Sequence, residues 1–126
     1  MRALVVDDSR AIRVILRQML AELGYEVSEA RHGREALLHL QGHPDTGVAL
    51  IDWNMPEMNG LELVEAVRAD ARLAHVKLMM VTTETEMAQM ARALEAGADE
   101  YVMKPFTKAV IDAKLRLIGA TTGVSA

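Results

Sequence analysis

Three carboxylates, one hydroxyl and one ammonium group follow short apolar runs of this 126-residue chain. They belong to Asp7, Asp8, Asp52, Thr82 and Lys104. Carboxylates gathered in one crevice repel each other, which raises their pKa values unless a cation is present. Oxygen ligands suit a hard ion such as Mg²⁺, which binds one or two carboxylates together with phosphate oxygens and water. These residue types therefore indicate phosphoryl transfer around Mg²⁺, in which positioning and charge neutralisation supply most of the catalysis.

Asp52 is the candidate nucleophile, because it stands alone at the end of its run, whereas the adjacent Asp7 and Asp8 suit metal binding. A carboxylate that attacks a phosphoryl group becomes an aspartyl phosphate. Pro56 and a following Asn-Gly pair predict that the chain turns after Asp52. Taken alone, an Asp-Asp pair after a strand is more often a solvated loop or a helix cap. The functional interpretation therefore requires that all five groups reach one rim of the fold.

Five strand-like runs alternate with five helix-like patterns, which predicts a parallel sheet covered on both faces. The runs are 4–6, 25–30, 48–51, 76–81 and 101–103, and the helical patterns are 12–23, 33–40, 60–69, 87–94 and 110–118. We expect a flavodoxin-like (βα)5 fold, a doubly wound five-stranded sheet of order 2-1-3-4-5. In such a sheet, ligands bind outside the carboxyl ends of the first and third strands. The three aspartates follow these two strand ends.

The composition, 51% hydrophobic and 25% charged, is that of a globular protein, and we expect one domain over 1–119 with a short tail over 120–126. A formal charge of −4 gives no basic surface for nucleic acid. The chain has no cysteine for thiol chemistry, and no metal role is predicted for its four histidines. We find neither a run long enough to span a membrane nor a signal peptide, so we expect a cytoplasmic monomer without membrane insertion.

Short motifs, in this order and spacing, resemble the receiver domains of response regulators in two-component signalling. The most similar members are the stand-alone chemotaxis response regulators. The motifs are Asp7-Asp8-Ser9, Asp52-Trp53-Asn54-Met55-Pro56, Asn59-Gly60, Val81-Thr82, Gly97-Ala98 and Tyr101 with Lys104-Pro105-Phe106. The resemblance extends from residue 3 to about residue 118, and it implies the same strand order. It also implies a signalling protein rather than an enzyme.

In this family Asp52 would be the phosphoacceptor, phosphorylated by a histidine kinase or a histidine phosphotransfer protein. Asp8 would bind Mg²⁺ directly and Asp7 would bind it through water. Asp52 itself and the backbone carbonyl of Asn54 would complete the protein ligands. Lys104 would pair with the phosphoryl group, and the peptide bond that follows it is expected to be cis.

The resemblance further implies that Thr82 and Tyr101 form a switch pair. Thr82 would bond the phosphoryl oxygen, and Tyr101 would turn inward and change the face made by the fourth helix, fifth strand and fifth helix. An output protein would bind there, with the flagellar motor switch as a candidate in chemotaxis. The residues assigned to this output face are Met87, Met90, Tyr101 and Lys114, of which Met90 could equally belong to the core.

Three positions bear on access to the phosphoryl group and its hydrolysis: Asn54, Thr83 and Glu84. Asn54 and Glu84 match the chemotaxis type beside the attacking water, so we expect fairly fast self-dephosphorylation. Thr83 stands where typical members have Ala, and its bulk could narrow the entrance. Glu86 and Met87 replace lysines that help typical members to bind partners.

Other functions remain open from the sequence. Within signalling, the chain could be a phosphorelay intermediate or a receiver fragment of a larger regulator. A phosphatase of the haloacid-dehalogenase type needs a second Asp two residues after the nucleophile, where this chain has Asn54. A flavodoxin-like FMN binder needs a Ser/Thr-rich loop where this chain has Asp7 and Asp8. The basic residues Arg10, Arg13 and Arg17 are interpreted as a solvated helix face rather than a docking site for the phosphodonor.

Overall fold

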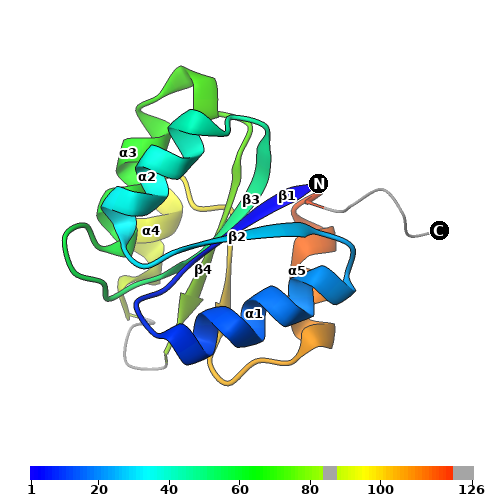
Figure 1. Cartoon of the computed structure of the whole chain (residues 1–126). Coiled ribbons are helices and arrows are strands. Elements are labelled where there is room, and N and C mark those ends of the chain that lie inside the picture. The colour runs from blue at the N-terminus through cyan, green and yellow to red at the C-terminus, as the bar shows by residue number, and fades with distance from the viewer. Residues whose placement is uncertain (84–87, 121–126) are drawn as a thin grey trace.

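The protein is an α/β sandwich built around one parallel sheet (Figure 1). The computed structural model describes residues 1–83 and 88–120. The strand order is β2-β1-β3-β4-β5, which confirms the predicted doubly wound topology. The strands are β1 Arg2–Val6, β2 Glu26–Ala30, β3 Thr46–Asp52, β4 Lys77–Thr82 and β5 Glu100–Met103.

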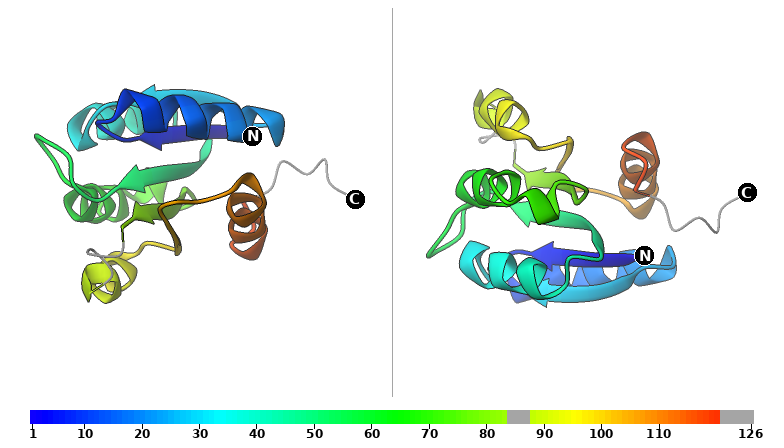
Figure 2. Two further views of the ribbon diagram at one scale, coloured as in Figure 1. Left: turned by 90° about the horizontal axis from the view of Figure 1, so that it is seen from below. Right: turned by 90° about the horizontal axis from the view of Figure 1, so that it is seen from above.

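Helices cover both faces of this sheet. They are α1 Arg10–Glu22, α2 Gly33–Gly42, α3 Gly60–Arg68, α4 Met90–Ala96 and α5 Lys108–Leu117, with the short 3-10 helix η1 Ala71–Leu73. Figure 2 shows α2, α3 and α4 on one side of the strands and α1 and α5 on the other. None of the helices within 1–83 and 88–120 is long and apolar enough to cross a membrane.

The central strands are buried on both faces, as their uninterrupted apolar runs predict. Along β3, Ala49 and Ile51 pack toward α2, α3 and α4, while Val48 and Leu50 pack toward α1 and α5. All four side chains are 0% exposed. The sheet therefore separates two apolar cores, and β3 is held from both sides up to its last residue, Asp52.

Helices begin close to the carboxyl ends of the strands because polar side chains cap them. Ser9 accepts a hydrogen bond from the backbone N–H of Ile12 at 3.4 Å, and Thr107 accepts one from Val110 at 3.2 Å. Each cap is worth about 1 kcal/mol. They fix α1 and α5 just beyond the rim on which the polar residues lie.

Some boundaries and exposures differ from the prediction. Helix α2 continues to Gly42, beyond the predicted end at 40, and η1 was not predicted. Ile15, Leu94 and Val110 belong to the predicted apolar stripes but are 44%, 43% and 43% exposed. Each helix contacts the sheet along only part of its stripe, so residues at the margin of the stripe stay in solvent.

Candidate functional site

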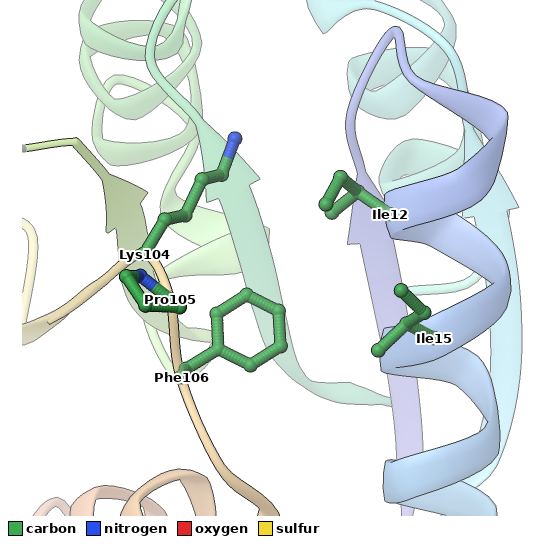
Figure 3. Close-up of a pocket in the computed structure, with 5 residues that line it drawn as sticks. All are labelled: Ile12, Ile15, Lys104, Pro105 and Phe106. Atoms are coloured by element: carbon green, nitrogen blue, oxygen red, sulfur yellow. The ribbon is translucent and has the colours of Figure 1, made fainter.

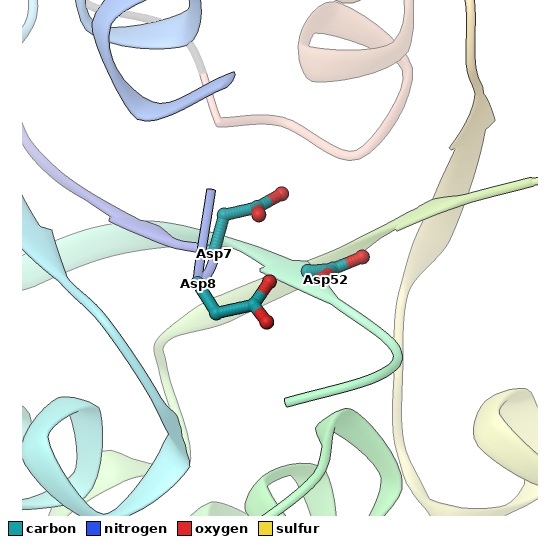
Figure 4. Close-up of side chains that lie close together, drawn as sticks. All are labelled: Asp7, Asp8 and Asp52. Atoms are coloured by element: carbon teal, nitrogen blue, oxygen red, sulfur yellow. The ribbon is translucent and has the colours of Figure 1, made fainter. Parts of the chain in front are cut away.

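The carboxylates of Asp7, Asp8 and Asp52 converge where β1 and β3 end (Figure 4). One oxygen from each lies within 4.8 Å of the others. Strands β1 and β3 are hydrogen-bonded neighbours in the register Val6 to Ile51, so the residues that follow them emerge side by side. The sheet order thus brings together aspartates that are 44 or 45 positions apart in the sequence.

Lys104 reaches the same cluster from the end of β5. Its Nζ lies 3.2 Å from Oδ1 of Asp52 and 3.5 Å from Oδ2 of Asp7. The backbone N–H of Lys104 donates to the carbonyl of Thr82 at 2.7 Å, which ties the ends of β4 and β5 together. Thr82 is fully buried and follows Val81, the residue that pairs with Asp52 across the sheet. All five predicted groups therefore lie on one rim.

The backbone fixes one oxygen of Asp7 and leaves the other directed into the cluster. Oδ1 accepts a hydrogen bond from the backbone N–H of Ser9 at 2.8 Å. Oδ2 is buried and has no hydrogen-bond partner among the residues that the structure describes. The ammonium of Lys104 at 3.5 Å makes an ionic contact that is longer than a hydrogen bond of good geometry. A buried carboxylate oxygen without such a bond is costly unless a cation satisfies it.

The carboxylates of the cluster carry more negative charge than the ammonium of Lys104 can balance, and they are partly removed from water. Burial, reinforced by the charge of Asp7, raises the pKa of Asp52 to about 6, although Lys104 opposes the shift. Burial also raises the pKa of Asp7. Burial lowers the pKa of Lys104, but Asp52 and Asp7 outweigh this and hold it above its ordinary value. One ammonium therefore does not neutralise the site, and a further cation would.

The donor set fits Mg²⁺. The cluster offers only oxygen ligands, and the Oδ2 atom of Asp7 needs an electropositive partner. Asp7, Asp8 and Asp52 are the residues that would hold the ion. Asp8 is exposed while Asp7 and Asp52 are buried, so the site opens to solvent on the Asp8 side. An ion with bound water can therefore approach there.

Two glycines let helices approach the loop that follows Asp52. The N–H of Gly60 donates to the carbonyl of Trp53 at 2.9 Å, and that of Gly33 donates to Met58 at 3.1 Å. A Cβ atom on Gly60 would lie 2.5 Å from the carbonyl oxygen of Asp52, and one on Gly33 would lie 2.4 Å from that of Met58. The predicted turn is present, but its support by Gly33 could not be predicted from the sequence, because Gly33 and Met58 come from distant parts of the chain.

An apolar pocket of about 370 Å³ lies beside the acidic cluster, between α1 and the segment after β5 (Figure 3). It is lined by Ile12, Ile15, Lys104, Pro105 and Phe106. In Figure 3 the two isoleucines face Phe106 across the opening, and the ammonium of Lys104 extends beyond it. The sequence did not predict this pocket, because it forms between two segments that are far apart in the chain. The cis bond expected between Lys104 and Pro105 is present.

The predicted switch and output residues differ in their burial and contacts. Tyr101 is partly buried, and Nζ of Lys114 lies 4.7 Å from the centre of its ring while pairing with Glu100 at 3.3 Å. Met90 is only 4% exposed and packs in the core formed by α2, α3 and α4. Of its two predicted roles, the structure therefore supports core filling, and the assignment of Met90 to the output face is corrected: this first residue of α4 is not available on the surface. Met87 lies outside the described residues.

Of the residues predicted to control access to the phosphoryl group, the structure describes Asn54 and Thr83. Asn54 is exposed in the loop after Asp52, and Thr83 is partly buried directly after β4. Glu84 and Glu86 lie outside the described residues. Of the basic residues on α1, Arg13 and Arg17 bind Glu29 at 3.1 and 2.8 Å, so they join α1 to the edge strand β2.

The fold and the site define a doubly wound α/β domain with an acidic cluster that could hold a hard cation at its topological switch point. Sequence comparison identifies the family. The response regulator receiver domain family matches residues 3–116, and the chain belongs to this family. This confirms the resemblance inferred from the motifs.

Individual relatives agree with this assignment. The chain is 48% identical to the chemotaxis protein CheY1 of Helicobacter pylori over 122 residues, covering 96% of this chain and 98% of the relative. It is 46% identical to a chemotaxis protein CheY homolog of Campylobacter jejuni, covering 100% of this chain and 98% of the relative. The structure of Vibrio cholerae CheY4 superposes with a TM-score of 0.86 at 36% identity, covering 93% and 97% of the two chains.

Proposed function

We propose that this protein is a stand-alone response regulator of chemotaxis signalling that is phosphorylated on Asp52. One observation carries the proposal: the carboxylate of Asp52 is 3.2 Å from the ammonium of Lys104 and shares its crevice with the unsatisfied Oδ2 of Asp7. This arrangement supports a nucleophile held between a fixed cation and a second cation site. The match to chemotaxis relatives over nearly their whole length supports the signalling role.

The phosphodonor is the phosphohistidine of a histidine kinase or a histidine phosphotransfer protein. An oxygen of Asp52 attacks phosphorus, the phosphorus–nitrogen bond breaks, and the leaving imidazole takes up a proton. Lys104 neutralises charge on the phosphoryl oxygens and keeps the Asp52 carboxylate oriented. Bound Mg²⁺ supplies the remaining positive charge. Because Asp7 and Asp52 repel each other, neutralising them also favours the ionised, nucleophilic form of Asp52.

The pocket between Ile12, Ile15 and Phe106 supports docking of the donor beside the nucleophile. Its walls are apolar, and it lies on the Lys104 side of the acidic cluster. A donor helix that buries an apolar side chain there would bring a neighbouring phosphohistidine close to Asp52. Specificity for the donor would then depend on α1 and on the segment 104–106, which are held together by tertiary packing alone.

After phosphorylation, Thr82 and Tyr101 act as the switch. The phosphoryl group adds charge and acceptor oxygens beside the buried Thr82 hydroxyl, and the protein shifts toward a packing in which Tyr101 turns inward. An output protein then binds at β5 and α5, near Tyr101 and Lys114, and the flagellar motor switch is our candidate.

Asn54, Thr83 and Glu84 control water access, and self-dephosphorylation by hydrolysis of the acyl phosphate is fairly fast. The protein acts as a cytoplasmic monomer, with a receiver domain over 1–119 and a tail over 120–126, and not as an enzyme.

The direct test is phosphorylation by a small donor. Incubation with acetyl phosphate and Mg²⁺ is expected to add one phosphoryl group, which intact-mass spectrometry and peptide mapping should place on Asp52. The matched control is Asp52→Asn, which keeps the shape of the side chain but removes the nucleophile. Normal phosphorylation of Asp52→Asn, or modification of the wild type elsewhere, would contradict the proposal.

A further inference from the structure

His39 and His43 form a stacked pair of imidazoles at the carboxyl end of α2. Their ring centroids are 4.3 Å apart and the ring planes differ by 15°. The pair lies before β3, whose far end carries Asp52, so it is at the opposite end of the sheet from the acidic cluster. The spacing of four residues is visible in the sequence, where no metal role was predicted for any histidine. The structure shows that this spacing brings the two rings together.

The backbone fixes the tautomer of His43. Its Nδ1 lies 3.0 Å from the carbonyl oxygen of His39. A carbonyl only accepts hydrogen bonds, so Nδ1 carries the hydrogen and Nε2 keeps a free lone pair in the neutral ring. Histidines that bind metals commonly donate their other ring nitrogen to a carbonyl in this way. His43 is therefore prepared to bind a metal through Nε2.

The surroundings of His39 favour its neutral form. Burial lowers its pKa, and the nearby His43 and Arg2 lower it further against the opposing charges of Asp45 and Glu35. A neutral imidazole has one nitrogen with a lone pair, so no proton has to be displaced before a metal binds.

The end of the helix also favours a cation. The last carbonyl groups of α2 carry the negative end of the helix dipole. The cationic Arg2 is engaged by Asp45 at 2.8 Å, which offsets its repulsion. Rotation of the half-buried His39 ring about χ2, a torsion with broad minima for histidine, turns its lone pair toward an ion bound at Nε2 of His43.

We propose that His39 and His43 bind a divalent transition-metal ion such as Zn²⁺ or Cu²⁺, with water in the remaining coordination positions. Imidazole suits these metals better than Mg²⁺, and the last turn of α2 together with its C-cap residue His43 brings two imidazoles side by side. Among the described residues, the acidic cluster is the one group of three or more metal-binding side chains close enough to hold an ion. The histidine site is therefore bidentate, and it is chemically distinct from the acidic site.

Isothermal titration of the untagged protein with ZnCl₂ tests this inference. Excess Mg²⁺ is present throughout so that the acidic cluster is occupied. We expect one Zn²⁺ per chain, a loss of affinity on the order of tenfold or more in His39→Gln and in His43→Gln, and no measurable binding in the double variant. Circular dichroism verifies that each variant keeps its helices.

The matched control is His75→Gln. His75 is exposed and its Nε2 contacts the carbonyl of Pro44, so it lies near the pair without belonging to it. Its replacement should leave Zn²⁺ binding unchanged. A loss as large as in His39→Gln, or undiminished binding by the double variant, would overturn the two-histidine site.

A second measurement on the wild type does not depend on variants. Long-range ¹H–¹⁵N spectra report the imidazole nitrogens, and Zn²⁺ should shift Nε2 of His43 while Nδ1 keeps its hydrogen. A Zn²⁺-dependent change confined to other histidines would contradict the assignment.

Discussion

At the scale of single residues, Asp52 carries its negative charge at a cost to stability when no metal is bound. Its pKa is raised from 3.8 to about 6, chiefly by burial. The folded protein therefore holds the Asp52 proton more tightly than the unfolded chain does. The associated stability is fully present below pH 3.8 and is lost as the pH rises through about 6.

This predicts that Asp52→Asn stabilises the metal-free protein at pH 7.5. The gain should be on the order of 1–2 kcal/mol, since each pKa unit corresponds to about 1.4 kcal/mol and the variant loses the pairing with Lys104. Urea unfolding at pH 5 and pH 7.5 measures it, and the difference from wild type should be larger at the higher pH. Addition of Mg²⁺ should reduce the difference, because the ion stabilises the wild type more. An equal difference at both pH values would contradict the assigned cause.

The three aspartates and Lys104 should have opposite effects on Mg²⁺ binding. Asp8→Asn removes a ligand and should weaken binding on the order of tenfold or more. Lys104→Met removes a cation that competes for the same carboxylates, so binding should be equal to or tighter than in wild type at pH 8. The fluorescence of Trp53, the only tryptophan and the neighbour of Asp52, reports the titration. Much weaker binding by Lys104→Met would show that the lysine supports the metal site instead.

At the scale of elements, the acidic site depends on how closely α3 approaches the end of β3. Gly60 lies in the first turn of α3, where a Cβ atom would come within 2.5 Å of the Asp52 carbonyl oxygen and 2.8 Å of the Met80 side chain. The Asp52 carbonyl belongs to the backbone where β3 ends, so it could move away from such a Cβ atom only if the backbone itself shifted. The absence of a side chain at Gly60 thus sets the position of the loop that follows the nucleophile.

Gly60→Ala is therefore expected to destabilise the protein by about 1–3 kcal/mol and to weaken Mg²⁺ binding. The control is Gly42→Ala at the last residue of α2, where a Cβ atom would meet nothing within 4 Å. That substitution should leave stability unchanged or raise it by up to about 1 kcal/mol, because alanine favours the helix. Urea unfolding and Trp53 titrations compare the two. Equal effects would mean that the close contact does not matter.

At the scale of the whole molecule, the rim couples the site to a distant face. Lys104 follows β5 directly and contacts the acidic cluster, and its backbone N–H donates to the carbonyl of Thr82. Tyr101 lies in β5, three residues before Lys104. A phosphoryl group on Asp52 would therefore lie beside Lys104, the residue that follows the strand carrying the proposed switch residue. A change at Lys104 could then pass along the backbone of β5 to the surface formed by β5 and α5.

This coupling predicts that beryllofluoride, which mimics the phosphoryl group on Asp52, changes the surface around Tyr101 and Lys114. Amide spectra should show shifts in β5 and α5, and affinity capture from a motile bacterium should retain an output protein that the untreated form does not. Thr82→Val keeps the size of the side chain but removes the hydroxyl, and it should reduce the shifts at Tyr101 without abolishing beryllofluoride binding. Shifts confined to the rim would contradict the proposed switch.

The sequence alone determined the alternation of strands and helices, because uninterrupted apolar runs and helical stripes record burial directly. It also determined which side chains could do chemistry, since Asp7, Asp8, Asp52, Thr82 and Lys104 each follow such a run. Their convergence could be expected only by assuming the strand order, which local patterns do not specify.

Only the tertiary structure decided how these groups meet. It placed Lys104 within 3.5 Å of both Asp7 and Asp52, and it left one oxygen of Asp7 without a hydrogen bond to any described residue. It also buried Met90, for which the sequence left both the output face and the core open. It also opened the pocket at Ile12 and Ile15 and stacked His39 on His43. These outcomes depend on contacts between separate elements, whose distances and burial are set by packing of the sheet and helices and not by the residues nearest in the chain.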